Sequence, residues 1–451
     1  MTSRIWSAGQ ALLFPLVAMG LVAAAALAPT GDAAPAREPS SVAVTQSSYA
    51  CPAGSVITVA SGQVEPGTAA TASALPERTP VEQLGDASTW RTGVVGAPGV
   101  VVEQQGSGSG AVGYFAGTAP ASGGGGLVVG SCTGIVDDAW LLGLGSGNQH
   151  FSTLILTNLA GSPAAVDLTL WGPEGKVDAV DADGIVIEPY SVSRIRLDSL
   201  AAGESELAVH VHRRRGSVSA VVNDSSTATF KGTEPVSASR PPRREQVVGG
   251  LVEGAAGRTL LVLNPGSSTA RVDVQVIGAD GTFTPTGLEQ VTVKGGTVQA
   301  VIVPDTAGSD AQALRLTSDQ PVSAAVRLAP TTTDYAYAEA TAALTGPAVV
   351  PVDLGQQGVT ARLVLTAPGQ EATVEVQAFD AAMAPLTSST VTVAAGTTQI
   401  ADVVAEAAYL VLRPTGQVVA AATYTKGDAI SSLALTAAPI SALAPQVRPA
   451  G

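Results

Sequence analysis

The sequence predicts an all-β protein whose chain repeats one two-sheet unit of about 100 residues. The first observation is a recurring strand. Residues 153–158, Thr-Leu-Ile-Leu-Thr-Asn, return as Thr-Leu-Leu-Val-Leu-Asn at 259–264, and the same offset of 106 residues carries 166–168 onto 272–274. A constant offset over several segments is typical of a repeat architecture. We therefore expect tandem copies of one fold.

Composition is the second observation, and it favours strands over helices. Charged residues make up 13% of the chain and aromatic residues 4%, while 50 of the 451 residues are glycine. Strands and turns suit a chain rich in Gly, Val, Thr and Ser, whereas helices need more Glu, Lys and Leu. The length predicts three or four domains of ordinary size, and each repeat is large enough to bury its own core.

The third repeat shows most clearly how the strands follow one another. Apolar residues at 261–263 end at the turn signal Asn264-Pro265-Gly266, and alternating valines at 272–276 begin the next strand. Continuing to Val326 gives six or seven short strands, the number that an immunoglobulin-like β-sandwich needs. A small propeller-like closed array, with four strands in each blade, is the alternative.

The repeat boundaries follow from the turn signals. We expect the following segments: 1–36, signal peptide or single membrane anchor; 37–50, flexible linker; 51–135, divergent first β unit; 136–245, second unit; 246–345, third unit; and 346–451, fourth unit with a C-terminal strand. Within the first unit, residues 79–90 do not align with the other repeats, and we assign a short helix there.

The N-terminus has the residue order of an export signal. Arg4 precedes an apolar run at 11–28, which we expect to be helical, and small residues follow at 33–36. The run is at the lower limit for a membrane span and Pro15 interrupts it, so a cleaved signal and a retained anchor both remain open. We predict an extracellular or cell-envelope protein that touches a membrane only through residues 11–28, if this segment is not cleaved.

The chain has two cysteines, Cys51 and Cys132, near the two ends of the first unit. Export would place them where disulfides persist, so we predict that they pair. Closing a loop of about 80 residues would stabilise the fold by roughly 4 kcal/mol. The competing interpretation, a nucleophilic Cys132, has no accompanying base in the sequence.

The charge and motifs exclude several function classes. A formal net charge of −14 disfavours nucleic acid and anionic lipid as partners, because both need dense Lys and Arg. The sequence has no nucleophile elbow, phosphate-binding loop or metalloprotease motif, and we expect no cofactor and no catalytic residue. Asp137, Asp138, Asp198 and Asp224 lack the spacing of a calcium loop or a catalytic acid pair, and we interpret them as turn residues.

Histidine is the main metal-ligand candidate. His210 and His212 lie two apart on a predicted strand, so both side chains leave the same face, and His150 could be a third ligand. The repeat aligns these two positions with Arg315 and Thr317, on the outer side of the strand. We therefore favour exposed strand residues and predict no metal site, with the three-histidine site as the alternative.

Arginines concentrate in one stretch of this acidic chain: Arg213, Arg214, Arg215, Arg240, Arg243 and Arg244. The planar guanidinium suits phosphate and carboxylate, so these residues are a candidate polyanion-binding patch. The alternative is a solvated hairpin tip and linker.

Exposed aromatic rings are a further route to binding, because they stack on sugars. Trp171 aligns with Ile277 and Phe379, so we expect it to pack within a strand. Trp140 follows two aspartates in a connector and is the candidate for glycan stacking. Packing in the core or between repeats is its alternative role.

Several segments resemble a known family: 208–211, 223–225, 263–266, 272–281, 313–316 and 318–322. They are similar to a secreted actinobacterial family known only as a domain of unknown function, and the similarity covers most of residues 50–445. The motifs are turn and strand signatures. The resemblance therefore implies tandem β-sandwich repeats and supplies no activity or catalytic residue.

These observations predict a non-enzymatic exported protein of the cell envelope, with a binding or scaffolding role. Its partner would be an envelope protein or wall polymer of unknown identity. A glycan- or polyanion-binding accessory of cell-wall assembly is the alternative. A glycan hydrolase comes third, because neither a nucleophile with its base nor metal-ligand spacing is evident in the sequence.

Overall fold

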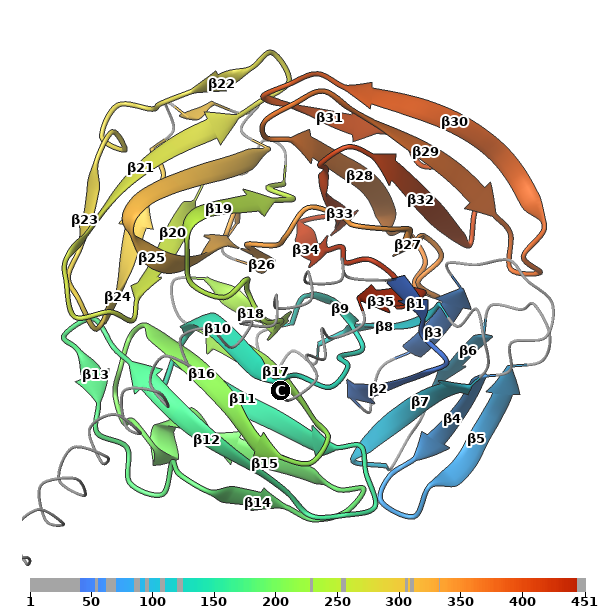
Figure 1. Ribbon diagram of the computed structural model, residues 1–451, viewed down its shortest axis with the longest axis horizontal. Coiled ribbons are helices and arrows are strands. Elements are labelled where there is room, and N and C mark those ends of the chain that lie inside the picture. Colours follow the sequence, from blue (N-terminus) through green and yellow to red (C-terminus); the bar gives the residue numbers. More distant parts are fainter. Residues whose placement is uncertain are drawn as a thin grey trace, which may run out of the picture. The chain divides into compact units, whose positions relative to one another are not determined.

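A computed structural model describes residues 41–52, 56–61, 70–84, 90–93, 97–105, 110–119, 125–227, 230–252, 257–304, 307–308, 312–331 and 333–443. Over these residues the protein consists of antiparallel strands and one short 3-10 helix, η2 (Leu197–Ser199) (Figure 1). The predicted all-β fold is confirmed. The expected helix at residues 11–28 lies outside the described residues, and no helix within them is long and apolar enough to cross a membrane.

The chain divides into two compact parts. Residues Ala43–Ile440 form the larger part and carry all four repeats. In the other part, β1 (Ser41–Ala43) and β35 (Ser441–Leu443) form a two-stranded sheet.

The first repeat has two four-stranded sheets, with strand orders β2-β7-β4-β5 and β6-β3-β8-β9. The strands are β2 (Gln46–Pro52), β3 (Val56–Ser61), β4 (Ala70–Ala74), β5 (Thr79–Leu84), β6 (Trp90–Gly93), β7 (Gly99–Gln105), β8 (Ala111–Thr118) and β9 (Leu127–Ser131).

The second repeat has the same topology, with orders β10-β16-β12-β13 and β15-β11-β17-β18, and β14 beside β12. The strands are β10 (Asp138–Leu144), β11 (His150–Asn158), β12 (Ala164–Trp171), β13 (Lys176–Val177), β14 (Ile185–Ile187), β15 (Val192–Arg196), β16 (Leu207–Arg215), β17 (Val218–Thr227) and β18 (Lys231–Val236).

In the third repeat one long strand, β25 (Ala313–Leu328), takes part in both sheets. Its first half pairs with β19 and β21, and its second half pairs with β20 and β26. The other strands are β19 (Arg243–Gly249), β20 (Arg258–Asn264), β21 (Ala270–Ile277), β22 (Thr282–Phe283), β23 (Val291–Val293), β24 (Thr297–Ile302) and β26 (Ala336–Glu339).

The fourth repeat returns to two separate sheets, β27-β32-β29-β30 and β31-β28-β33-β34. The strands are β27 (Ala348–Pro351), β28 (Thr360–Ala367), β29 (Ala372–Phe379), β30 (Pro385–Val393), β31 (Thr397–Ala401), β32 (Tyr409–Thr415), β33 (Val419–Lys426) and β34 (Ala429–Ala434). Two sheets in each repeat match the predicted sandwich, whereas a propeller blade has one.

A buried asparagine explains why the repeated strand ends in Asn. Asn158 at the end of β11 and Asn264 at the end of β20 are both fully buried. Each side-chain amide donates to a turn carbonyl four residues on, at 2.8 Å, and to the carbonyl of Ile187 or Val293 respectively, at 3.1 Å. These carbonyls are again 106 residues apart, so the same residue satisfies the same buried backbone groups in both repeats.

The short helix expected at residues 79–90 is wrong where the structure describes that segment. Residues 79–84 form β5, which pairs antiparallel with β4, and Trp90 begins β6. Residues 79–84 differ in sequence from the other repeats but still form a strand. Backbone pairing with β4 outweighs the weak local preference of these residues for a helix.

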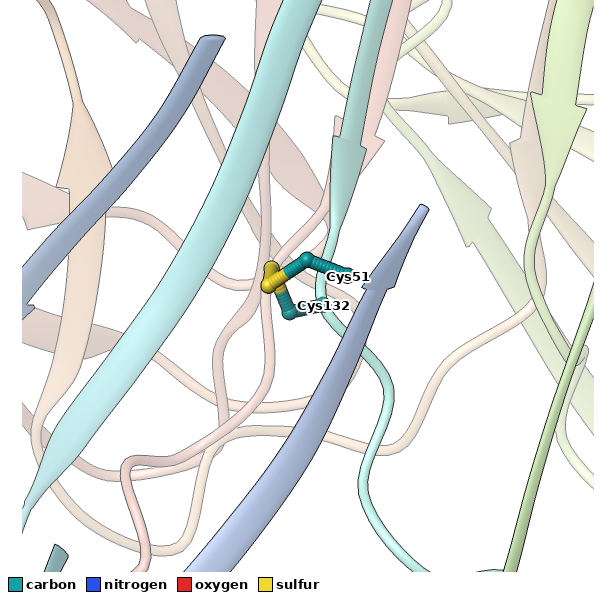
Figure 2. The surroundings of a disulfide bond; sticks show 2 residues. All are labelled: Cys51 and Cys132. Atoms are coloured by element: carbon teal, nitrogen blue, oxygen red, sulfur yellow. A yellow bond between two sulfur atoms is a disulfide. The ribbon is translucent and has the colours of Figure 1, made fainter. Parts of the chain in front are cut away.

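The predicted disulfide between Cys51 and Cys132 is present (Figure 2). Cys51 lies in β2, Cys132 directly follows β9, and both side chains are buried in the core of the first repeat. The bond therefore joins the two sheets of this repeat. Gly113 passes so close that a Cβ there would lie 2.8 Å from the Cys132 sulfur, which explains glycine at this position of β8.

The last strands of the four repeats, β9, β18, β26 and β34, pack against one another, and we call them the junction strands. Asp334, just before β26, ties three of them together: its carboxylate accepts hydrogen bonds from the backbone N–H of Leu127 (3.0 Å) and of Ile430 (2.9 Å). On β18, a Cβ at Gly232 would lie 2.7 Å from the same carboxylate. One carboxylate thus lies where segments of all four repeats meet.

Candidate functional site

A cleft of about 310 Å³ lies between the first and second repeats, and we call it the inter-repeat cleft. Strands β8 and β9 form one wall, and strands β11, β15, β17 and β18 form the other. Its lining residues are Pro52, Phe115, Gly117, Thr118, Ala119, Val128, Ile155, Arg194, Val221, Val222, Asn223, Thr233 and Pro235. The volume is at the lower end of the range for small-molecule sites.

The inter-repeat cleft combines apolar and polar lining surface in nearly equal measure. Phe115 and Ile155 contribute apolar surface, while Arg194 and Asn223 are exposed and contribute a guanidinium and an amide. Arg194 donates one hydrogen bond to the Pro98 carbonyl at 2.6 Å, which holds the guanidinium against the first repeat. A guanidinium has five donors, so most of them remain for a ligand.

A second group of side chains lies on the second repeat, where β10 and β16 pair. Asp138 is directly opposite His212, and Trp140 is directly opposite His210. One carboxylate oxygen of Asp138 lies 2.7 Å from His210 Nε2 and 2.9 Å from His212 Nδ1. These three ligand atoms all lie within 4.8 Å of one another.

The charges of this group depend on one another. Partial burial alone would raise the pKa of Asp138, but hydrogen bonds from His212 and His210 lower it. The pKa of His210 is lowered, chiefly by burial, although Asp138 acts in the opposite direction. The group therefore favours an ionised carboxylate and a neutral imidazole.

The alternative of a three-histidine metal site is wrong, because His150 is in a different network. His150 begins β11, and its Nε2 lies 3.0 Å from a carboxylate oxygen of Asp224. The structure puts Asp138 in the place of the third ligand. Asp138 and Asp224 also lie within strands, so their interpretation as turn residues is wrong.

Asp224 is fully buried and accepts hydrogen bonds from both repeats that meet around it. The hydroxyl groups of Tyr335 and Tyr337 donate to it at 2.8 and 3.0 Å, and that of Ser152 at 2.5 Å. Burial alone would lower the pKa of His150, but its attraction to Asp224 raises it. Ser152 donates directly to the carboxylate, and because Tyr335 and Tyr337 belong to the third repeat, this set of side chains joins the second and third repeats.

Trp140 is half-buried, and its ring already has partners within the protein. The ring centroid lies 3.9 Å from that of His210 and 5.8 Å from that of Trp171, both in stacked geometry. Trp171 is buried together with Leu263 and Val298 of the third repeat. A sugar that stacks on Trp140 would therefore have to displace the His210 or Trp171 ring, or bind on ring surface that these two residues leave uncovered.

Acidic side chains neutralise part of the predicted arginine patch. Arg213 forms an ion pair with Asp137, and Arg214 forms one with Asp167. Arg215, Arg243 and Arg244 are exposed, whereas Arg240 is half-buried and its pKa is lowered, mainly by burial. The exposed positive charge is therefore smaller than the sequence alone indicated.

Three further carboxyl groups are buried among the junction strands. Burial raises the pKa of Glu339 to about 8 and that of Asp334 to about 6, and it raises the pKa of Glu234 well above its ordinary value. Glu234 accepts a hydrogen bond from the Ser431 hydroxyl at 2.6 Å. At neutral pH burial therefore favours the neutral forms of Glu339 and Glu234, and all three groups lie between repeats.

Comparisons with known proteins agree with the sequence motifs. A family model described as a family of unknown function, DUF5719, matches residues 89–404. A search of curated proteins gave no match. The matched range includes the whole second and third repeats, and with them the inter-repeat cleft's second wall and the Asp138 group.

Proposed function

Since the chain belongs to this family of unknown function, whose description names no activity, we propose a function from the geometry: a non-enzymatic, exported cell-envelope protein that binds a wall polymer in the inter-repeat cleft. The observation that carries the proposal is that apolar side chains line the cleft together with the Arg194 guanidinium and the Asn223 amide. Sugar rings have apolar faces and polar edges, and acidic sugars also carry a carboxylate that a guanidinium binds well.

The packing of the repeats supports binding by a preformed surface. Each wall of the cleft belongs to a sheet that includes a junction strand, β9 in the first repeat and β18 in the second. The Tyr114 hydroxyl on β8 also donates to the Val349 carbonyl of the fourth repeat at 2.5 Å, which holds one wall in place. A rigid site loses little conformational entropy on binding.

Export is supported by the cysteines and by the N-terminal segment. The buried bond between Cys51 and Cys132 is of the kind that persists in oxidising compartments. The apolar run at residues 11–28 has the order of an export signal.

Ligand binding to the purified full chain tests the proposal. Soluble acidic fragments of cell-wall glycan are titrated and followed by saturation-transfer NMR and equilibrium dialysis. We expect Asn223→Trp, which fills the cleft, and Arg194→Ser, which removes the guanidinium, to weaken binding at least tenfold, about 1.4 kcal/mol. Arg196→Ser is the matched control, because Arg196 is on the same strand, pairs with Asp198 and does not line the cleft.

Three results would count against the proposal. Binding that survives Asn223→Trp would place the ligand elsewhere. Absence of binding to every wall fragment would favour a spacer role. Conversion of a glycan by the protein, abolished by one Asp, Glu or Ser substitution, would establish a hydrolase.

Polyanion binding through the arginines is the second candidate, because Arg215, Arg243 and Arg244 are exposed. Replacing these three with Ser should weaken adsorption to an anionic wall polymer, and the loss should shrink as salt is added. Replacing Arg213 and Arg214 should have less effect, since acidic partners already neutralise them. Unchanged adsorption of the first variant would discard this candidate.

A further inference from the structure

We propose that Asp138, His210 and His212 bind a divalent transition-metal ion, with zinc as the best fit, at a site separate from the inter-repeat cleft. The proposal rests on a convergence of two imidazole nitrogens and one carboxylate oxygen that all lie within 4.8 Å of one another. It does not depend on the identity of the cleft ligand.

The strands place the three donors without help from a loop. His210 and His212 leave the same face of β16, and Asp138 is directly opposite His212 on β10. The carboxylate oxygen is 2.7 and 2.9 Å from the two nitrogens. Donors around a tetrahedral zinc lie roughly 3.3 Å apart, given bonds of about 2.0–2.1 Å, so the carboxylate oxygen would have to move about half an ångström away from each nitrogen. Asp138 is 43% exposed and can move that far.

The donor set selects the class of ion. Imidazole nitrogens suit zinc, copper and nickel, whereas calcium and magnesium prefer sites made only of oxygen. Three protein donors leave at least one coordination position for water or for an external group. The exposure of His212, 54% of its side chain, puts that position within reach of solvent.

Neighbouring side chains prepare the site. The ring of Trp140 stacks on His210 and restrains the rotation of the imidazole. Asp167 lies directly opposite His212 on β12 and adds a second negative charge nearby, although Arg214 pairs with it.

The third repeat shows what this position looks like as an ordinary ion pair. There Glu245 is directly opposite Thr317, and Val247 is opposite Arg315, in the register that Asp138 and the histidines have in the second repeat. Arg315 donates to Glu245 at 2.6 Å. A guanidinium cannot ligate a metal, and one cation is enough for the pair. Two imidazoles on one carboxylate oxygen therefore exceed what an ion pair needs.

Zinc binding to the full chain tests the proposal. Calorimetric titration and metal analysis after dialysis at pH 7.5 should give one tightly bound zinc ion per chain. Cobalt as a substitute should give the visible absorption of a low-symmetry site. His210→Ala, His212→Gln and Asp138→Asn should each lower the zinc affinity at least tenfold. Glu245→Gln is the matched control and should leave the affinity unchanged.

Transfer of the site gives a second, independent test. Combining Glu245→Asp, Arg315→His and Thr317→His should raise the stoichiometry from one zinc to two, because the register is the same. The proposal is overturned if the wild type binds zinc no better than the His210→Ala variant, or if His212→Gln, an exposed and conservative change, leaves stoichiometry and affinity intact.

Discussion

Glu339 provides a quantitative test of how the buried carboxyl groups control stability. It ends β26, is 4% exposed, and accepts a hydrogen bond from the Ser237 N–H at 3.0 Å. Burial raises its pKa from 4.5 to about 8. The folded protein therefore holds this proton more tightly than the unfolded chain does. The resulting stabilisation is complete below about pH 4.5 and is lost as the pH rises to about 8.

The size of the effect follows from the same values. Between pH 4.5 and pH 8 the unfolding free energy falls by about 1.4 kcal/mol for each pH unit. Ionising Glu339 should therefore lower the unfolding free energy by on the order of 5 kcal/mol by pH 9. Glu339→Gln keeps the oxygen that accepts from Ser237 and cannot ionise. We expect the variant to match the wild type at pH 5 and to be more stable by roughly 3–5 kcal/mol at pH 9.

Urea unfolding followed by tryptophan fluorescence, at pH 5, 7 and 9, measures this difference. Glu371→Gln is the control, because Glu371 is exposed and its replacement should change the pH dependence little. Burial also raises the pKa of Asp334, so this residue contributes to the pH dependence of the unfolding free energy. Because Asp334 is present in both the wild type and Glu339→Gln, its contribution cancels when the two are compared. If wild type and Glu339→Gln lose the same free energy between pH 5 and pH 9, the assignment of a neutral, buried Glu339 is refuted.

Three other changes test the ties described above. Replacing Cys51 and Cys132 with Ser should remove roughly 4 kcal/mol, because their bond closes a separation of 81 residues; equal melting temperatures with and without reductant would contradict this. Asn264→Ala leaves buried backbone carbonyls without donors and should cost about 1–3 kcal/mol in chemical denaturation, and a cost near zero would show that water replaces the amide. Asp224→Ala leaves the buried hydroxyl groups of Ser152 and Tyr335 without their acceptor and His150 without its carboxylate, and it should cost about 3–5 kcal/mol in the same assay; a smaller loss than for Asn264→Ala would mean that the network relaxes.

The features that the sequence predicts well are local or periodic. The offset of 106 residues locates β11 and β20, and the alignment of His210 with Arg315 holds in the strand register. The cysteine pair could be predicted because the chain has only two cysteines. Alternating apolar residues were enough to predict two sheets in each repeat. This alternation marks strands that bury one face, and two sheets that pack face to face need such strands.

The features that were missed depend on register between distant strands. Asp138 is 72 residues from His210 in the sequence, and only the pairing of β10 with β16 brings them together. The cleft requires walls from two repeats, and the network at Asp224 requires Tyr335 of the next one. No local pattern reports such contacts. The two tyrosines at 335 and 337, spaced to share one face of a strand, were the nearest available signal.

The hydrogen bonds of Asp334 also set an order on biosynthesis. Leu127 and Ile430, which donate to the same carboxylate, are separated by roughly 300 residues, and a ribosome needs about 15–60 s to add that many. The Leu127 N–H of the first repeat therefore gains its acceptor only when Asp334 has been added, 207 residues later, and the carboxylate gains the Ile430 donor a further 96 residues on. A nascent chain that stops before residue 430 would leave this carboxylate without one of its backbone donors, so a buried polar group would stay incompletely bonded until the fourth repeat is nearly finished.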